Sequence, residues 1–492
     1  MSTFDTDVVV VGAGPTGLML AGELRLNGVS VVVLEKLAEP IRESRALGFS
    51  ARTIEEFSQR GLLSRFGEVD VIPVGHFGGV PLDFRVLEGG SYGARGVPQA
   101  RTEGVLGGWA RELGAEVRRG VRVLALEQDA DGVAVTGAAE GGAVTLRARH
   151  VVGADGARSA VRKLAGIDFP GTEPAVELRF ADVAGVRLRP RFSGERVPGG
   201  MAMVLPLGPD RARLVYFDAA RPLRAADGPI AFDEVVEAWR RLTGEDVSGA
   251  TPLWVSSTTD ASRQASQYRR GRVFLAGDAA HIHLPIGAQG MSAGVQDAVN
   301  LGWKLALDVK GQAPPGLLDT YQAERRPVGA RILANTLAQR VLYLGGDDVA
   351  PLREVFAELV ERHEPVRRHL AGMVTGLDIR HATVPGEHPL LGRRLPDGEL
   401  IADGEKTSVF ALLAAGRALL LELRDGLGLR EAAAGFADRV DALRVDALRP
   451  DAAAPADAVL VRPDGYVAWV APPGAGAGGL PDALSRWFGP AA

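Results

Sequence analysis

The sequence of 492 residues contains no cysteine. This absence excludes disulfides, thiolate metal sites, iron–sulfur clusters and cysteine nucleophiles within the chain. Any redox chemistry must therefore come from a bound cofactor, which the protein binds, orients and tunes. The eight histidines include His281 and His283, but no carboxylate cluster accompanies this pair, so the sequence predicts no metal site.

The chain also lacks a basic charge excess and a long apolar run. Its formal net charge of −5 offers no field that would attract nucleic acid or an anionic membrane. Asp5 and Asp7 stand where a signal peptide carries Lys or Arg, and no stretch approaches the roughly 20 apolar residues of a membrane span. We therefore expect a cytoplasmic protein of two or three domains that binds neither nucleic acid nor membrane. The oligomeric state is open, with a homodimer as one option.

Residues 7–36 have the pattern of one βαβ unit. Apolar runs at 7–11 and 30–34 predict strands that are buried on both faces of a parallel sheet. The segment 18–26 between them has helical character, and Gly28 ends it. A right-handed crossover joins such elements into one supersecondary unit.

A glycine loop follows the first of these strands, with the sequence Gly12-Ala13-Gly14-Pro15-Thr16-Gly17. In a dinucleotide-binding loop of this spacing, the first glycine permits a tight turn, the second the close approach of a pyrophosphate, and the third close helix–strand packing. Glu35 ends the second strand, at the offset of a carboxylate that binds ribose hydroxyls. This arrangement favours an adenosine without a 2′-phosphate, as in FAD or NAD, over an ordinary glycine turn.

A second segment, Gly153-Ala154-Asp155-Gly156, places Asp-Gly at the end of another predicted strand. Ser159 follows at the position from which a side chain caps a short helix. A plain capped turn and a cofactor contact are equally good interpretations of this segment taken alone.

A third segment begins with Gly277-Asp278 after the apolar run 272–276. Asp278 can accept hydrogen bonds from a polyol or ribityl chain. The residues from Gly287 to Ser292 are too small to form core and can place backbone N–H groups against a planar ring. We expect the helix that starts near Ala293 to direct its positive end at that ring, where it would stabilise the negative charge of reduced flavin.

In combination and order, these segments resemble the group A FAD-dependent aromatic hydroxylases, the para-hydroxybenzoate hydroxylase-like family, over essentially the whole chain. The chain is most similar to the aromatic polyketide hydroxylases, particularly the angucycline hydroxylases of actinomycetes. The segments that carry this similarity are SRALGFSARTIE (44–55), GHFGGVPLDF (75–84), HIHLPIGAQGM (281–291), HLAGMVTGLDI (369–379) and HPLLGRRLPDGEL (388–400).

The resemblance implies an α/β fold with a GR2-type Rossmann FAD domain, an inserted β-sheet substrate domain and a C-terminal thioredoxin-like domain. The expected limits are 1–75, 99–174 and 270–385 for the FAD-binding domain, 76–98 and 175–269 for the substrate domain, and 386–492 for the thioredoxin-like domain. Because the last domain has no cysteine, it has no disulfide redox role.

The resemblance also assigns residues to the cofactor. Arg45 would lie near the flavin and the pyrophosphate, although a surface ion pair with Glu43 or Glu35 is the alternative. Gln99 would contact the ribityl chain, and Asp155 would lie near the pyrophosphate and the approaching nicotinamide nucleotide. The full set of predicted cofactor residues is Gly12, Gly14, Pro15, Thr16, Gly17, Glu35, Lys36, Arg45, Gln99, Val123, Asp155, Asp278, Pro285, Gly287, Gln289, Gly290, Met291 and Ser292. Ser292 and Ala279 differ from the Asn and Ser of many relatives; contacts there are expected through the backbone.

The reaction implied by the resemblance is hydroxylation of an aromatic polyketide in antibiotic biosynthesis. NADPH or NADH reduces the flavin, dioxygen adds at the flavin C4a position to form a hydroperoxide, and the distal oxygen passes to an electron-rich ring. No catalytic base is predicted, and His281 is interpreted as a residue that packs or hydrogen-bonds within its turn. Glu324 and Arg325 are interpreted as ion-pair residues.

The stretch after His76 is a candidate roof for a large flat substrate, although a loop with a buried aromatic explains it equally well. Its predicted substrate contacts are Phe77, Gly78, Gly79 and Pro81. Two other functions are kept open. One is Baeyer–Villiger oxygen insertion or reduction of a related polyketide by the same flavin. The other is a non-catalytic nucleotide-binding protein on the same scaffold.

Overall fold

The computed structural model describes residues 4–41, 43–44, 46–87, 93–224, 228–446 and 455–491. A mixed sheet at the centre has the order β19-β20-β11-β1-β2-β8, and β9 and β10 extend β11 as antiparallel neighbours. The strands β20, β11, β1, β2 and β8 run parallel. The strand bounds are β1 Thr6–Val11, β2 Val31–Glu35, β8 Glu116–Arg119, β9 Arg122–Gln128, β10 Val133–Ala139, β11 Gly142–Gly153, β19 Arg269–Arg270 and β20 Val273–Leu275.

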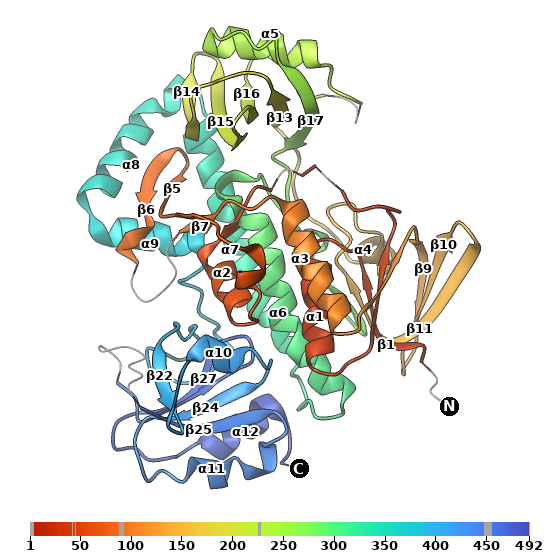
Figure 1. Cartoon of the computed structure of the whole chain (residues 1–492), viewed down its shortest axis with the longest axis vertical. Coiled ribbons are helices and arrows are strands. Elements are labelled where there is room, and N and C mark those ends of the chain that lie inside the picture. The colour runs from red at the N-terminus through yellow and green to blue at the C-terminus, as the bar shows by residue number, and fades with distance from the viewer. Residues whose placement is uncertain are drawn as a thin grey trace.

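Three helices lie side by side against this sheet (Figure 1). They are α1 (Pro15–Leu26), α3 (Gln99–Glu112) and α6 (Gln289–Val309). Glycines set their close approach: a Cβ on Gly22 of α1 would lie 2.0 Å from the Trp109 ring of α3. A Cβ on Gly302 of α6 would lie 2.5 Å from the Cβ of Glu23 on α1. The α1–α6 pair is thereby held close along its length, which brings the two helix starts to the same sheet edge.

A five-stranded antiparallel sheet of order β14-β15-β16-β13-β17 lies apart from the central sheet (Figure 1). One face packs on α5 (Phe232–Thr243) through a buried cluster that includes Tyr216 and Trp239. The other face forms an apolar cluster with Leu284 and Ile286, just before α6. The strand bounds are β13 Glu177–Ala184, β14 Arg191–Val197, β15 Gly200–Gly208, β16 Arg211–Asp218 and β17 Thr251–Thr259.

The hairpin of β5 (Val74–Phe77) and β6 (Val80–Asp83) forms its own two-stranded sheet and does not pair with the five-stranded one. Its apolar side packs in one cluster with α8 and α9. The remaining elements of this part are α2 Ala51–Ser58, α4 Ala160–Leu164, α7 Asp319–Leu344, α8 Ala350–Arg362, α9 Glu364–Thr375, β3 Phe49–Ser50, β4 Val71–Ile72, β7 Ala94–Arg95, β12 Gly171–Thr172, β18 Ser262–Gln264 and β21 His281–Ile282.

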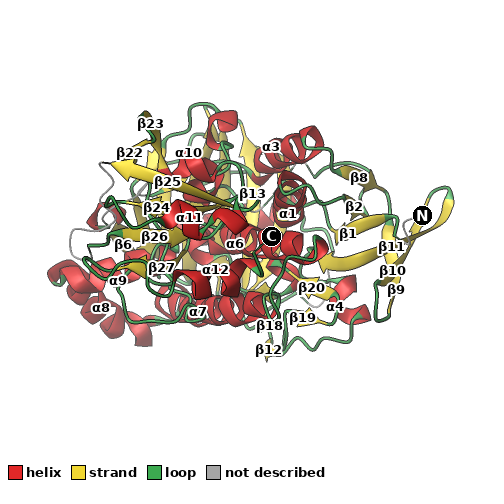
Figure 2. Cartoon of the chain, turned by 90° about the horizontal axis from the view of Figure 1, so that it is seen from below, coloured by secondary structure: helices red, strands yellow, loops and turns green. Residues whose placement is uncertain are grey.

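The C-terminal domain contains a six-stranded sheet of order β23-β22-β25-β24-β26-β27. Parallel β24 and β25 lie beside the antiparallel pair β26–β27, and α12 follows, which is the arrangement of a thioredoxin-like core. The described part of the chain begins beside β11 and ends on this domain (Figures 1 and 2). The bounds are β22 Glu399–Ala402, β23 Glu405–Ser408, β24 Ala418–Glu422, β25 Val440–Asp446, β26 Ala458–Val461, β27 Val467–Ala471, α10 Val409–Leu413, α11 Leu429–Ala432 and α12 Leu480–Phe488.

The C-terminal domain shares its core with the rest of the chain. Trp303 and Leu307 of α6 belong to the same buried cluster as its sheet. Beside them, Arg462 pairs with Glu324 of α7 at 2.6 Å, and Lys304 of α6 pairs with the same carboxylate at 2.9 Å, with all three side chains 0% exposed. Burial lowers the pKa of Lys304 to about 8. Removing one member of a buried ion network leaves the others uncompensated, so these charges fix the two domains to each other.

Candidate functional site

The three glycine segments predicted from the sequence start from neighbouring positions on one sheet edge. Val11 of β1 is paired with Leu34 of β2 and with Gly153 of β11, and Gly153 is paired with Leu275 of β20. Because these strands are parallel, their carboxyl ends form one row across the sheet. Loops that leave such a row converge on the crevice where α/β sheets bind ligands.

The first glycine loop is built for close backbone approach. Gly12 has φ +109°, and a Cβ there would lie 2.3 Å from the carbonyl oxygen of Ala154. A Cβ on Gly17 would lie 2.0 Å from the carbonyl oxygen of Gly12. A Cβ on Gly14 would meet nothing within 4 Å, and Gly14 begins α1 with no side-chain cap and Pro15 in its first turn. Open space before an uncapped helix start fits a pyrophosphate.

Glu35 lies at the end of β2, beside this loop. Its Oε2 accepts a hydrogen bond from Ala13 N at 2.8 Å, and its Oε1 accepts one from Leu37 N at 2.9 Å. A carboxylate has about four acceptor positions, so two hydroxyl groups can still donate to it. The fixed carboxylate fits a ribose diol. Lys36 is exposed, and Val123 is buried in β9, the strand that follows β8 in the sequence.

The Asp155 segment is a strand, turn and helix with two caps. The Ser159 hydroxyl accepts from Arg162 N at 2.9 Å, as predicted for a cap. The carboxylate of Asp155 is also used here, since it accepts from Ala160 N at 2.6 Å and Val161 N at 3.2 Å. The capped-turn interpretation is therefore confirmed. The cofactor role of Asp155 stays a prediction, which its backbone could serve because it faces Gly12.

Thr16 holds the starts of α1 and α6 together. A Cβ on Gly277 would lie 2.6 Å from the Thr16 hydroxyl oxygen, and a Cβ on Gly294 would lie 2.2 Å from it. The Gly-Asp turn is thus wedged between the two helix starts. Asp278 in that turn is exposed, and no described residue forms a hydrogen bond with its carboxylate. The carboxylate is available to a polyol chain.

The helix after the third segment begins at Gln289, four residues before the predicted start near Ala293. Gly287, at φ +75°, forms the bend before it, and residues 289–292 form the first turn. Contacts with distant elements hold this turn despite Gly290: the Ser292 hydroxyl accepts from Ser50 N at 3.0 Å. The Gln289 amide exchanges two hydrogen bonds of 3.1 Å with Asn335 on α7. Because α6 begins at Gln289, the backbone N–H groups of residues 289–291 have no partner in a preceding α-helical turn.

Asp297 on α6 is a site residue that the sequence interpretation missed. It is 0% exposed, and it accepts hydrogen bonds from Gly277 N at 3.0 Å, His281 Nε2 at 2.8 Å and Arg325 Nε at 2.7 Å. Burial alone would raise the pKa of Asp297, but Arg325 and His281 hold it below its usual range. The carboxylate ties the Gly-Asp turn to α6 and α7. An acidic residue within the mostly apolar segment 293–299 was the signal for it.

His281 is buried and forms a hydrogen bond as expected, but its partner is Asp297 on α6 and not a group of its own turn. The ion-pair interpretation of Glu324 and Arg325 is also confirmed, and both side chains are buried. Within the described part of the chain, His, Asp and Glu form no cluster that could hold a metal ion.

The turn at residues 76–79 packs tightly against α7. Phe77 is 5% exposed and lies in an apolar cluster with α8 and α9, whereas Pro81 is exposed. A Cβ on Gly78 would lie 2.7 Å from Leu342, and a Cβ on Gly79 would lie 2.9 Å from Tyr343. This geometry matches the loop with a buried aromatic. Substrate contact by these residues stays a prediction.

A buried chain of amides connects this turn with the start of α6. Gly78 N donates to the Gln339 side chain at 3.2 Å, and Gln339 donates to Asn335 at 2.9 Å. Asn335 is bonded in turn to Gln289. This series of hydrogen-bonded amides fixes the position of the α6 start relative to the turn at residues 76–79.

For four of the predicted cofactor residues, the structure gives no contact that points to a cofactor. The Gln99 side chain donates to Glu103 at 2.8 Å at the start of α3. Pro285 is exposed, and Met291 packs partly buried against the main core. Arg45 lies outside the described residues, and so does its alternative ion pair.

Comparison with known proteins gives the same picture along the whole chain. Residues 5–336 match the family described as FAD binding domain, and residues 388–491 match the family described as aromatic-ring hydroxylase, C-terminal. The chain is 46% identical to the 12-dehydrotetracycline 5-monooxygenase/anhydrotetracycline 6-monooxygenase of Streptomyces rimosus subsp. rimosus, over 99% of both chains.

Two solved structures are similar over nearly all of the chain. AlpK is 74% identical with a TM-score of 0.92 and 100% of both chains covered. CabE, an aromatic hydroxylase from angucycline biosynthesis, is 54% identical with a TM-score of 0.94, covering 99% of this chain and 100% of the other. The chain belongs to the family of FAD-dependent aromatic-ring hydroxylases.

Proposed function

We propose that this FAD-dependent monooxygenase hydroxylates an aromatic polyketide of angucycline type in antibiotic biosynthesis, with NADPH or NADH as reductant and dioxygen as oxidant. The observation that carries the proposal is the convergence of three loops on one row of strand ends, beside the start of α6. The chemistry of similar proteins, which act in tetracycline and angucycline biosynthesis, supports the substrate class.

FAD supplies the hydride and oxygen chemistry when it is bound, and the chain binds, orients and shields it. The N–H groups at the start of α1, behind Gly14, bind the pyrophosphate. The Glu35 carboxylate accepts hydrogen bonds from the adenosine ribose, and Asp278 accepts them from the ribityl chain. Further contacts are proposed for Lys36, Arg45, Gln99, Val123, Asp155 and Pro285.

The first turn of α6 acts on the flavin ring. Its N–H groups and the positive end of the helix dipole stabilise negative charge on the pyrimidine side of the ring, as an oxyanion hole stabilises an alkoxide. Gly287 forms the bend before that turn in a left-handed conformation that suits glycine. Asp297 keeps the turn at Gly277 in register with the helix.

The polyketide binds between the five-stranded sheet and the start of α6. Phe180 and Met201 on the sheet share an apolar cluster with Leu284 and Ile286, which lead directly into Gly287. These side chains are buried against one another, so a flat, apolar substrate would lie beside this cluster and next to the flavin ring. The hairpin with Phe77 would cover its outer side.

The testing experiment is a panel of angucycline, anthracycline and tetracycline-type intermediates with the yellow holoenzyme. We expect one class to accelerate NADPH oxidation and to yield a product about 16 mass units heavier, the mass of one added oxygen atom. A colourless protein that fails to bind added FAD would overturn the proposal. Product without added oxygen would instead indicate a reductase, and oxidation that no substrate accelerates would indicate a non-catalytic protein.

The oxygen insertion of a Baeyer–Villiger reaction adds the same mass, and the product's ring size separates it from hydroxylation. NADPH and NADH are compared in the same assay.

The domain limits given above and the homodimer stay predictions.

A further inference from the structure

His76 lies in β5 of the two-stranded hairpin, on the face opposite to the buried apolar cluster. Phe77 and Val80 are paired with each other across the hairpin, and both pack in the cluster with α8 and α9. His76 is paired with Pro81, and successive side chains of a strand alternate between its two faces. His76 is therefore directed away from the apolar cluster with α8 and α9.

The surroundings of His76 belong to the proposed polyketide site. The centroid of its ring lies 5.3 Å from that of Tyr343, and Tyr343 is in the same apolar cluster as Leu284 and Ile286. Strand β5 also lies against the segment 286–288, which leads into the first turn of α6. A substrate beside this cluster would therefore meet the hairpin at His76.

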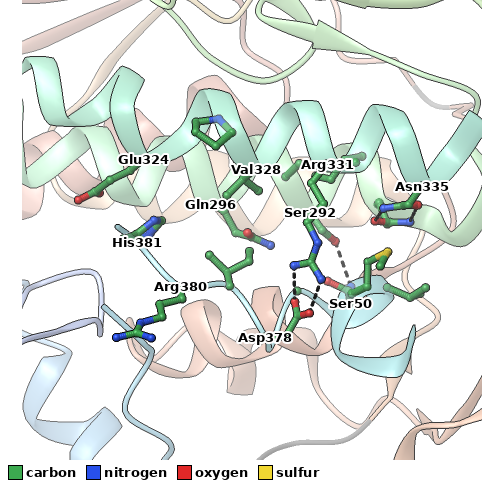
Figure 3. A pocket seen from close by; sticks show the side chains of 18 of the residues that line it. Ser50, Ser292, Gln296, Glu324, Val328, Arg331, Asn335, Asp378, Arg380 and His381 are labelled. Atoms are coloured by element: carbon green, nitrogen blue, oxygen red, sulfur yellow. Dashed lines mark hydrogen bonds and ion pairs between the residues drawn. The ribbon is translucent and has the colours of Figure 1, made fainter. Parts of the chain in front are cut away.

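The hairpin is held in a fixed position relative to the first turn of α6. Gly78 N donates to the Gln339 side chain at 3.2 Å, Gln339 donates to Asn335 at 2.9 Å, and Asn335 is bonded to Gln289 in that turn. Asn335 lines the cavity between α6 and α7 together with Ser292 of the same turn (Figure 3). A side chain on the hairpin can therefore hold a substrate at a set distance from this turn.

A hydrogen bond within the hairpin determines which ring nitrogen of His76 carries a proton. Gly79 N donates to Nδ1 of His76 at 3.3 Å, so Nδ1 is the acceptor. Burial lowers the pKa of His76 to about 4, and the ring is therefore neutral at pH 7, with one acceptor and one donor nitrogen. The donor is the Nε2–H group at the tip of the side chain.

This donor has no partner within the described part of the chain. Nε2 of His76 forms no hydrogen bond there. It differs from Nδ1 of His281 and Nε2 of His283, which are also unpaired but are shielded from solvent. An N–H group that becomes buried without an acceptor costs free energy. A ligand that covers His76 must therefore bring an acceptor oxygen to Nε2.

We propose that His76 is a positioning residue for the polyketide. Its Nε2–H group donates a hydrogen bond to a carbonyl or phenol oxygen of the substrate and thereby sets which ring carbon faces the flavin. Because Nε2 already carries a proton, His76 acts by orientation and not as a base. An analogue without the bonded oxygen would leave the donor unpaired, and sites of this kind discriminate strongly against such an analogue. This role rests on the function proposed above.

The test compares wild-type holoenzyme with His76→Phe, His76→Leu and His76→Gln. Each is assayed with an accepted polyketide and with analogues that each lack one of its oxygen atoms. We expect the two variants without a donor to lose about ten- to a hundredfold in kcat/KM for hydroxylation. More of the NADPH that they oxidise should yield hydrogen peroxide. His76→Gln places an amide N–H group near the position of Nε2 and should recover part of the loss.

One of the analogues should identify the bonded oxygen. For that analogue the loss caused by His76→Phe should disappear, because wild type and variant then both lack the hydrogen bond. The matched control is His388→Phe. Nδ1 of His388 also accepts from a backbone N–H group at 3.3 Å, that of Leu390, but it lies at the entry to the C-terminal domain. This control should leave kcat/KM and peroxide formation unchanged.

Flavin content and thermal unfolding confirm that each variant is folded. Unchanged kcat/KM in the folded donor-free variants, or an equal loss with every analogue, would overturn the role of His76 and leave the proposed function intact. A wild-type holoenzyme that hydroxylates no polyketide would overturn the proposed function and the role of His76 with it.

Discussion

The buried carboxylate of Asp297 offers a sharp test of how the flavin loops are held. Asp297 is 0% exposed and Arg325 is 2% exposed, so neither charge has water to replace its partner. Replacing Asp297 with Asn removes the negative charge and turns one acceptor oxygen into an amide donor. In the wild-type protein Gly277 N, His281 and Arg325 all donate to Asp297. The new amide N–H₂ group must face at least one of these donors, with which it cannot form a hydrogen bond.

The magnitude follows from these contacts. Breaking a buried ion pair by changing one partner costs about 3–5 kcal/mol, because the remaining charge is uncompensated. Part of this cost is local to the Gly277 turn, which leaves the sheet beside the flavin ring. If about 1.4–2.8 kcal/mol of this cost destabilises the Gly277 turn, FAD binding would weaken about ten- to a hundredfold.

The assay compares Asp297→Asn with the matched Asp319→Asn, whose carboxylate pairs with Arg269 but is 74% exposed. Urea unfolding of the apoprotein and FAD titration by flavin fluorescence give the two readouts. We expect the surface variant to lose at most about 1 kcal/mol and to bind FAD normally. If both variants behave alike in both readouts, Asp297 does not hold the turn and the reasoning fails.

Three further substitutions test other parts of the account. At Gly14 the backbone is extended and a side chain would meet no other protein atom, so Gly14→Val should leave the stability of the apoprotein unchanged. The affinity for FAD should fall by more than about tenfold, because the side chain would occupy the space of the pyrophosphate. Normal flavin content in the purified variant would refute the pyrophosphate contact. Asp278→Ala should weaken FAD binding or slow flavin reduction by about tenfold in stopped-flow measurements, and wild-type kinetics would contradict its assignment. Burial raises the pKa of Glu56 to about 8 from its ordinary 4.5, despite Arg52 and Arg325, so the folded state holds a proton that the unfolded state releases. Its stabilising effect is therefore complete below pH 4.5 and is lost as the pH rises to about 8; Glu56→Gln should flatten this fall in unfolding free energy, and an unchanged pH profile would exclude it.

The local parts of the fold could be predicted from the sequence. The apolar runs at β1 and β2 and the glycine loop between β1 and α1 have a pattern set by neighbouring residues alone, and Ser159 caps α4 for the same reason. The βαβ connection predicts that β1 and β2 are parallel neighbours, whereas the sheet order that brings Ala154 and Gly277 beside Gly12 is seen only in the structure.

Features that depend on distant contacts could not be predicted. The residues 289–292 contain a glycine and read as a loop, yet they form the first helical turn because Ser50 and Asn335 bind it from other elements. Asp297 and Arg325 are 28 positions apart in the sequence and join α6 to α7, and the Arg462–Glu324 pair joins two domains. A single sequence shows that such residues are charged, but not which charges meet.

Transfer of one atom of dioxygen to an aromatic polyketide by a bound FAD can be followed directly. The measurement is the mass of the product formed by holoenzyme, NADPH and an accepted angucycline-type intermediate under ¹⁸O-labelled dioxygen. We expect one labelled oxygen atom in the product, attached to a ring carbon as a hydroxyl group. A product without the label, or with oxygen taken from water, would contradict it.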